Sequence, residues 1–580
     1  MDKEYNLHGL RVILFTSKCP DGLTSPDSLA IPLGLHTIKT YLTSYGAECD
    51  VCDFDLQDEQ PFVDRIGEGY YDVIGLSPTH WNMPTDLEFL FKIKRLATES
   101  GSNSLFIAGG HTATLAYQDW LPCGIDVIFL GHAEHTLLEY LNRFVLNNKE
   151  LSTSLCNELD GVAYVNDDAD VVVQHLKTQD SDEFVHSNFD IAKQMDAPYS
   201  EYWSKIRSRT TALQGANDRS YVVENARLYT SNRCIAKCGF CSSVGFLPVA
   251  HDKKWKFGML SADQILDLIK HNVAIYGARG FSLNDDDFLV GNNVGIKRAM
   301  RLCELITDAK DKGEIPKEVK FSCQTRVGNF LTRQSHKGKA DKKPQMVVNN
   351  ELMAAMRRAG FHNVSLGVES FSERLMKVPS INKIGITKAI CETVLDAFFD
   401  HELFPTINLI LLIPESTPSD LCETLYTAVD YLDKPMQIST SKSMRMFPGA
   451  PIWGSAQYPS IDVIKTNELT GESISIPVYC VPHDKKLQGL IECLDDHAAE
   501  ELQMFHKKYH LDQYFFPPRL VISLCNFLAI AKYLEEQQLI DKIEAKLEMF
   551  AVANGLSSDV PTSHLGRYMS EARSGLTAAD

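Results

Sequence analysis

Three cysteines, Cys234, Cys238 and Cys241, fall within eight residues of the chain. Thiolates are the soft ligands that iron-sulfur clusters and zinc prefer, and a bound metal keeps such thiols deprotonated. A structural zinc site normally has four protein ligands, and no fourth ligand lies nearby in the sequence. Three cysteines therefore indicate a metal centre with an open position for chemistry. A zinc site completed by a distant Cys or His, and chance core cysteines, remain as alternatives.

Short apolar strands alternate with helical patterns around these cysteines, which is typical of parallel βα units. The alternation resumes from Leu228, the cysteine segment directly follows a short apolar strand, and further strands are expected at 280–283, 319–323, 364–368 and 407–413. Thr417 followed by Pro418 and Asp420 predicts a helix start, because the three supply a cap, a first-turn proline and an acid near the helix dipole. This part of the chain predicts a β/α barrel or partial barrel.

The first 150 residues predict a second α/β unit. Apolar strands are expected at 11–15, 72–76, 104–108 and 125–130. Leu35, Ile38 and Leu42 recur at helical spacing between the first two strands, and Gly46 can end that helix. These features predict an open, doubly wound, Rossmann-like sheet, which binds ligands at the carboxyl ends of its strands.

A length of 580 residues exceeds what one core usually serves. We expect a Rossmann-like domain over 1–150, a polar connector over 151–225, a partial β/α barrel over 226–455 and a helical carboxyl-terminal domain over 456–580, with helices at 484–510 and 519–553. The basic stretch 333–343 predicts an inserted, solvated loop, with contact to an acidic substrate as the alternative.

Composition narrows the classes of partner. The net charge of −19, from 57 Lys and Arg against 76 Asp and Glu, argues against a broad nucleic-acid surface. No stretch approaches the roughly 20 apolar residues that span a bilayer, and the amino terminus lacks a signal-peptide pattern. We therefore expect a cytoplasmic protein with no membrane span and no nucleic-acid partner.

The Cys-x3-Cys-x2-Cys spacing resembles the signature of the radical S-adenosylmethionine (SAM) superfamily. The resemblance implies that Cys234, Cys238 and Cys241 hold three irons of a [4Fe-4S] cluster, with SAM on the fourth. It extends over roughly residues 225–455, although Arg233 replaces the glycine that usually precedes the first ligand. It implies SAM contacts from Phe240, Asp285, Asp286, Gln324, Arg326 and Glu369, while helix capping remains an alternative for Asp285 and Asp286.

Residues 1–150 resemble the cobalamin-binding domain that often precedes the barrel in this family, through the segments 31–34, 75–79, 109–111 and 131–134. The resemblance implies cobalamin contacts from Ser77, Thr79, His80, Gly109 and Gly110. The Asp-x-His-x-x-Gly signature that places a histidine on cobalt is absent from 16–22, so the loop around His80 is where a cobalt-facing residue is expected. An ordinary loop histidine, and a domain that has lost cobalamin, remain alternatives.

Together the resemblances imply reductive cleavage of SAM to a 5'-deoxyadenosyl radical and cobalamin-dependent methylation of an unactivated carbon. Ring formation or rearrangement without methyl transfer is one alternative, and a non-enzymatic metal-binding scaffold or iron-sulfur sensor is another. The implied partners are a small-molecule or biosynthetic-intermediate substrate and an electron donor such as flavodoxin or ferredoxin. Tyr514, Phe515 and Phe516 are candidates for either pocket lining or core packing.

Overall fold

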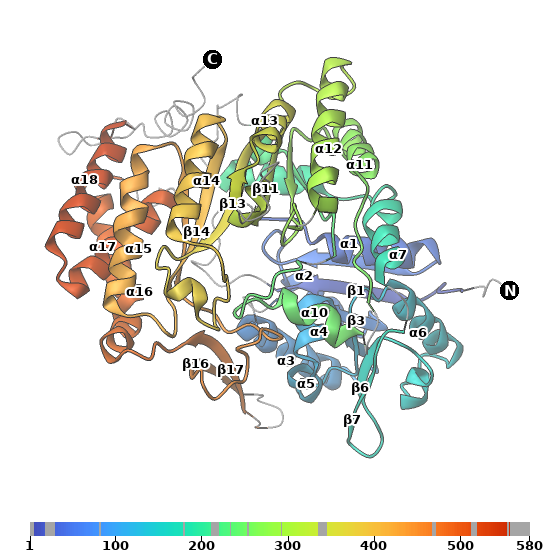
Figure 1. Ribbon diagram of the computed structural model, residues 1–580. Helices are drawn as coiled ribbons and strands as arrows, with labels where there is room; N and C mark the ends of the chain where they lie inside the picture. The colour runs from blue at the N-terminus through green and yellow to red at the C-terminus, as the bar shows by residue number, and fades with distance from the viewer. Residues whose placement is uncertain are drawn as a thin grey trace, which may run out of the picture.

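Two α/β units lie side by side in the computed structural model, and helices from the carboxyl-terminal part flank the second unit (Figure 1). The structure describes residues 5–17, 29–79, 83–177, 180–209, 220–232, 234–251, 255–291, 293–334, 345–466, 471, 473–511, 519–553 and 556. The candidate residues His80, Tyr514, Phe515 and Phe516, and most of the basic stretch 333–343, lie outside these ranges.

The first unit is a seven-stranded sheet in the order β2-β1-β3-β4-β5-β6-β7. The first five strands of this order are parallel, and the strand order reverses between β1 and β3, where open α/β sheets bind their ligands. The strands expected in this region are confirmed within two residues as β1, β3, β4 and β5. The strands are β1 (Arg11–Thr16), β2 (Glu48–Asp53), β3 (Val73–Leu76), β4 (Leu105–Ala108), β5 (Val127–Phe129), β6 (Val162–Val165) and β7 (Val171–Gln174).

Helices cover both faces of this sheet and build two separate cores. The expected crossover helix is confirmed as α1 (Leu33–Ser44), and Gly46 beyond its end has a left-handed φ of 95°. The other helices are α2 (Gln60–Gly67), α3 (Met83–Glu99), α4 (Gly110–Leu115), α5 (Tyr117–Trp120) and α6 (Glu134–Leu146).

The segment expected to be a polar connector contains β6 and β7, which extend the first sheet in antiparallel register. Both strands are short apolar runs inside a polar segment, and β7 is exposed or half-buried along its length. Helices α7 (Asp180–Val185), α8 (Tyr199–Arg209) and α9 (Ser220–Val223) and a π-helix, η4 (His186–Ile191), lead from there to the second unit.

The second sheet contains six parallel strands in the order β15-β14-β13-β10-β9-β8, which is the expected partial barrel. Strand β9 occupies the predicted 280–283. The strands are β8 (Asn225–Leu228), β9 (Gly280–Leu283), β10 (Lys320–Arg326), β13 (Phe361–Glu369), β14 (Phe404–Leu412) and β15 (Gln437–Ser443), and a small hairpin, β11 (Leu331–Gln334) and β12 (Gln345–Val348), follows β10.

Helices pack on the outside of this sheet, and the start predicted at Thr417 is confirmed. The Thr417 side chain accepts from the Asp420 amide, and the Asp420 side chain accepts from the Thr417 amide, so the two form a capping box. The helices on this sheet are α11 (Ala262–Tyr276), α12 (Asn293–Asp311), α13 (Asn350–Ala359), α14 (Lys388–Asp400) and α15 (Pro418–Asp430), whereas α10 (Ser243–Ala250) packs against α4 of the first unit.

The carboxyl-terminal part is helical, as expected, but it begins with an unpredicted antiparallel hairpin, β16 (Ser460–Thr466) and β17 (Ser473–Cys480). Ile476 of this hairpin is buried in the core of the first unit, and Lys465 forms an ion pair with Glu88 on α3. Helices α16 (Lys485–Lys508), α17 (Arg519–Leu534) and α18 (Gln537–Ala553) follow. Since α17 packs against the edge strand β15, most of its sequence is apolar.

Within the described ranges, no helix is long and apolar enough to cross a membrane.

Candidate functional site

The cysteine segment begins where β8 ends and is fixed at its start by Asp285. The Asp285 carboxylate is fully buried and accepts hydrogen bonds from the Thr230 amide at 2.5 Å, the Ser231 amide at 2.8 Å and the Thr230 hydroxyl. A buried guanidinium, that of Arg298, lies 3.8 Å from the same carboxylate. These contacts join Asp285 to the residues that support the start of the cysteine segment. Its side chain acts as an anchor for that segment.

The middle of the cysteine segment packs against the loop that follows β13. A β-carbon built on Gly239 would lie 2.1 Å from the Pro379 carbonyl oxygen and 2.7 Å from that of Ser380, so only glycine fits there. The Asn382 side chain donates to the Lys237 carbonyl at 2.6 Å, and the Ile452 amide donates to the Gly239 carbonyl at 3.2 Å. Two later parts of the chain therefore hold the cysteine segment in place.

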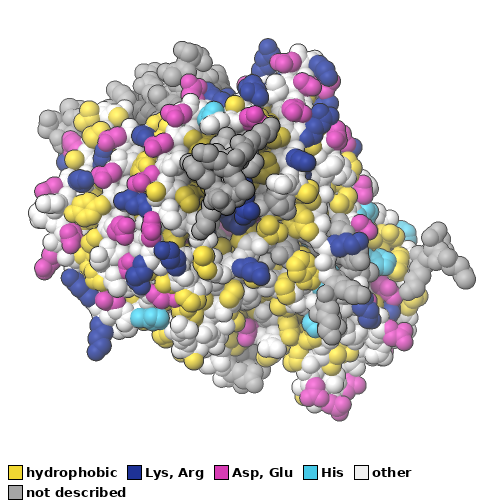
Figure 2. Space-filling model, viewed as in Figure 1, with side chains coloured by type: hydrophobic (Ala, Val, Ile, Leu, Met, Phe, Trp, Pro, Cys, Tyr) yellow, Lys and Arg dark blue, Asp and Glu magenta, His cyan; other side chains and the backbone are white. Residues whose placement is uncertain are grey.

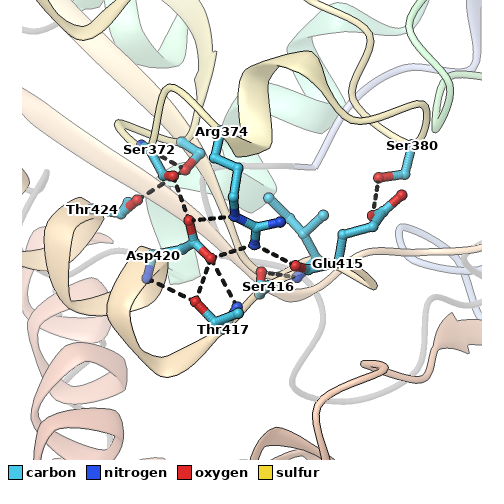
Figure 3. Close-up of polar contacts among 10 residues, drawn as sticks. Ser372, Arg374, Ser380, Glu415, Ser416, Thr417, Asp420 and Thr424 are labelled. Atoms are coloured by element: carbon cyan, nitrogen blue, oxygen red, sulfur yellow. Dashed lines mark hydrogen bonds and ion pairs between the residues drawn. The ribbon is translucent and has the colours of Figure 1, made fainter.

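A buried carboxylate network fixes that covering loop in turn (Figure 3). Asp420 accepts from the Ser372 hydroxyl at 2.6 Å and from the Arg374 guanidinium, which also donates to the Glu415 carbonyl. Ser380 donates to the Glu415 carboxylate at 2.5 Å. Burial alone would raise the pKa of Asp420, but hydrogen bonds from Arg374, Ser372 and Thr417 lower it to about 2.

The three cysteines are free thiols, with Cys238 buried and the other two half-buried. Burial raises the pKa of Cys234 to about 12 and that of Cys241 to about 11, and it raises the pKa of Cys238 against an opposing effect of the Lys383 ammonium. The unliganded thiols are therefore neutral at pH 7. A metal must displace their protons on binding.

Positive charge beside Cys238 comes from a buried ion pair. The Lys383 ammonium lies 2.7 Å from the Glu369 carboxylate and also donates to the Gly367 carbonyl at 2.5 Å. Glu369 ends β13 with a left-handed φ of 64°, uncommon for a residue other than glycine. Burial would lower the pKa of Lys383, but Glu369 and Cys238 raise it overall, so the ammonium stays charged.

Asp287 connects the first cysteine to the end of β10. Its carboxylate accepts from Thr325 at 2.6 Å, from Asn329 at 2.6 Å and from the Arg326 guanidinium at 2.8 Å. The Cys234 sulfur lies 4.0 Å from the same carboxylate. Asp287 was not among the predicted site residues, because the run of three aspartates does not reveal which of them turns toward the cysteines.

Among the described residues, no group of three or more His, Cys, Asp or Glu side chains is arranged around a single metal ion. A [4Fe-4S] cluster takes each thiolate on a different iron, so its ligands are spread wider than those of one ion. Three free thiols on one anchored segment, with the Lys383 and Arg326 cations among their charged neighbours, fit such a cluster.

A cavity of about 710 Å³ lies between the two units, at the carboxyl ends of strands from both sheets. The first unit contributes Ser77, Gly109 and Gly110 to its wall, and the second contributes Asp286. Gly110 has a left-handed φ of 85°. A β-carbon on Gly75, deeper in the cavity, would lie 2.6 Å from the Leu14 side chain, so the wall is closely packed there.

Rings from both units meet at this cavity. His111 on α4 stacks on Phe246 of α10 with centroids 4.9 Å apart, and His132 contacts Phe246 and Phe184 edge-on. The buried Ser231 hydroxyl, directly before the cysteine segment, also lines the cavity and has no hydrogen-bond partner among the described residues. The cavity therefore joins the cysteine segment to the binding edge of the first sheet.

The remaining candidate residues divide between the cavity and its support. Asp286 is exposed and lines the cavity, and the exposed Gln324 side chain contacts the Asp286 carbonyl at 3.5 Å. Phe240 packs against an apolar cluster below the cysteine segment. Thr79 donates its amide to Asp86, a buried residue absent from the expected set, at 3.2 Å.

Two family models match the chain. The B12 binding domain matches residues 22–141, and the Radical SAM superfamily matches residues 228–427. Cytidylyl-2-hydroxyethylphosphonate methyltransferase of Streptomyces wedmorensis is 22% identical over 378 residues, which is 60% of this chain and 62% of that protein. The match thus spans less than two thirds of the relative's length.

Two solved structures share the fold. The cobalamin-dependent S-adenosylmethionine radical enzyme OxsB, with aqua-cobalamin bound, superposes with a TM-score of 0.60 at 14% identity, over 98% of this chain and 85% of that one. The radical S-adenosylmethionine methyltransferase TsrM from Kitasatospora setae, with tryptophan and a SAM analogue bound, gives 0.56 at 15% identity, over 92% and 99%.

Proposed function

We propose that this chain, which belongs to the radical SAM superfamily and carries a B12-binding domain, methylates an unactivated carbon of a small-molecule substrate. A radical SAM domain binds a [4Fe-4S] cluster and SAM, and a B12-binding domain binds cobalamin, so these are the cofactors of the chain. One observation carries the proposed reaction. Asp286 of the barrel and Gly109 and Gly110 of the first domain line the same cavity.

When bound, these groups supply an electron that splits SAM, a 5'-deoxyadenosyl radical that removes hydrogen from the substrate, and a methyl group. The residues of the chain bind and orient these cofactors and enclose the substrate. Cys234, Cys238 and Cys241 are the proposed cluster ligands. Asp285 holds the start of their segment through the Thr230 and Ser231 amides, so its proposed role is positioning.

Asp286, Gln324 and Arg326 are the proposed SAM contacts at the ends of β9 and β10. Asp287 orients the Arg326 guanidinium through the 2.8 Å ion pair. Glu369, whose carboxylate is engaged by Lys383, keeps a charged pair beside Cys238 and would be a further contact for SAM. A charged pair in a nearly dry site interacts more strongly than it would in water.

Ser77, Gly109 and Gly110 are the proposed cobalamin contacts, because all three line the cavity. Ser77 follows β3, at the reversal of strand order, and Gly109 and Gly110 follow the neighbouring strand β4. The Thr79 amide donates to the buried Asp86 carboxylate, which fixes the backbone at Thr79, the last residue described before the gap. The S. wedmorensis relative is named for methylating a cytidylyl phosphonate, and the TsrM structure holds tryptophan. Methyl transfer to carbon is the class of reaction that we carry over to this chain.

The test is anaerobic reconstitution with iron, sulfide, cobalamin and SAM under dithionite, with 5'-deoxyadenosine and bound corrinoid both quantified. We expect the Cys238→Ala variant to lose deoxyadenosine but keep the corrinoid, because its change lies only in the second sheet's loop. Cys493→Ala removes a half-buried thiol from α16 and is the matched control.

Deoxyadenosine formed equally by Cys238→Ala would contradict the proposed cluster site. A substrate whose product is cyclised or rearranged, with no methyl group gained from SAM, would contradict methyl transfer and support the non-methylating alternative. Zinc in place of iron, with no SAM cleavage, would support the scaffold reading.

A further inference from the structure

The outer side of the cysteine segment lies one layer of chain below the surface. Gly239 packs directly on the Pro379 and Ser380 carbonyls, and Pro379 itself is exposed. The exposed Asn382 donates to the Lys237 carbonyl at 2.6 Å, and that carbonyl belongs to the peptide bond of Cys238. A molecule in contact with Asn382 is therefore connected to Cys238, a proposed cluster ligand, through one hydrogen bond and one peptide bond.

This surface combines an apolar centre with positive charge. Ile384 is 75% exposed, the highest exposure of any isoleucine that the structure describes. Lys237 and Lys377 are exposed, and hydrogen bonds from Asn382 and Lys383 join their segments to the residues just before Ile384. Glu373 is an exposed carboxylate four residues before Lys377. The short turn η8 (Leu375–Lys377) and the loop after it face the viewer below β14 in Figure 1, and Lys and Arg side chains lie among apolar ones there in Figure 2.

The surrounding structure holds this surface in shape. Arg374, directly before η8, is tied to Asp420 and to the Glu415 carbonyl (Figure 3). Ser380 is tied to the Glu415 carboxylate. A preorganised surface loses little conformational freedom when a partner binds, which favours association through a small interface.

We propose that Lys237, Lys377, Pro379, Asn382 and Ile384 form the docking face for an acidic one-electron carrier protein. The inference rests on the proposed function, because reductive cleavage of SAM consumes one electron that must come from outside the chain. One electron leaves the reduced carrier, which becomes oxidised by one electron, and enters the oxidised cluster, which becomes reduced by one.

Two physical reasons favour this face over the rest of the surface. Electron transfer weakens steeply with distance, so the carrier must dock over the cysteine segment, and the inner side of that segment faces the cavity enclosed by the first domain. The chain as a whole carries −19, which repels an acidic protein except where cations gather. Exposed lysines around an exposed apolar residue match the polar rim and apolar centre of a protein interface.

The experiment compares two reductants on the reconstituted full chain. A purified flavodoxin held in its hydroquinone form is the protein donor, and dithionite is the small donor that needs no docking face. Cluster reduction is followed by loss of its visible absorbance with SAM present, and binding of oxidised flavodoxin is measured by calorimetry. The test variant is Lys377→Glu with Ile384→Asp.

The matched control places the same changes elsewhere. Lys317→Glu reverses an exposed lysine before β10, and Ile275→Asp replaces an isoleucine that is 63% exposed on α11. For the test variant we expect flavodoxin-driven reduction to fall about tenfold at low ionic strength, within the range of electrostatic steering, with weaker binding and a smaller salt dependence. Dithionite-driven reduction stays at the unsubstituted rate in both variants.

Equal flavodoxin-driven rates in the test variant, the control and the unsubstituted chain would overturn the docking face. A test variant that also loses dithionite-driven reduction would overturn it as well, because its residues would then act on the cluster or the fold. Failure of the proposed function looks different. The unsubstituted chain would form no deoxyadenosine with dithionite, while the binding measurement would still report on the docking face.

Discussion

Replacing Gly239 by alanine tests how the cysteine segment is held. The added methyl group would lie 2.1 Å and 2.7 Å from two backbone oxygens, which cannot rotate away as a side chain can. Overpacking of this kind costs about 1 to 3 kcal/mol. At about 3 kcal/mol, the equilibrium between the held segment and a displaced one shifts by about 150-fold. The backbone of Gly239 is not in the left-handed region, so the contact alone produces the effect.

The assay measures iron and sulfide per chain after reconstitution, and the rate at which a chelator removes the iron. We expect Gly239→Ala to lose iron about tenfold faster or more, because the displaced segment exposes its thiolates. Gly67→Ala is the control, since a β-carbon there meets no atom within 4 Å. Iron loss at the same rate in both variants would refute the claim that the covering loop holds the cysteine segment.

Two further changes separate the parts of the site. Gly75→Val should weaken corrinoid binding while leaving the iron content unchanged, because the added side chain enters the cavity beside Leu14. The corrinoid spectrum and the iron content are measured on the same sample. Loss of both corrinoid and iron would contradict this prediction. Asp420→Asn should destabilise the fold by about 2 kcal/mol at pH 7, since the pKa of Asp420 is about 2 against an ordinary 3.8. A depressed carboxyl pKa stabilises the folded state above pH 4 and loses that effect as the pH falls toward 2. The melting temperatures of the two proteins should therefore converge over that range.

The sequence predicted the chemistry and the strands that carry it where one strong pattern was enough. The cysteine spacing, the strand at 280–283 and the cap at Thr417 are local features, and their physical reasons lie within a few residues. The structure adds the contacts that no local pattern holds. Glycine is needed at position 239 because Pro379 packs against it, and the Asn382 side chain bonds the Lys237 carbonyl. Each pair is separated by more than 130 positions of the chain.

Strands with polar sequences were missed for a related reason. β15 is rich in serine and threonine, and neighbouring segments satisfy some of these side chains: Asn526 of α17 donates to the Thr440 hydroxyl, and the buried Ser443 hydroxyl donates to the Cys480 carbonyl. Such a strand lacks the alternating apolar pattern, so it can be recognised only once its partner helix is known. In the same way, the side chains of Asp285 and Asp287 are directed by Thr230 and Arg326, which lie on two other segments, and Asp286 faces the cavity between the units.

The hydrophobic core of the first domain is completed only when the hairpin β16–β17 has been synthesised. Ile476 fills the core of a domain whose other members, apart from Ala250, all precede residue 180. A chain emerging from the ribosome can pair the strands of that domain early, but it leaves a gap in the core until the hairpin has been made. Because domains generally fold as units during synthesis, this one must wait for most of the chain. A gene fragment cut after the first sheet would therefore give a B12-binding domain with an open apolar face, and a useful minimal fragment must include residue 480.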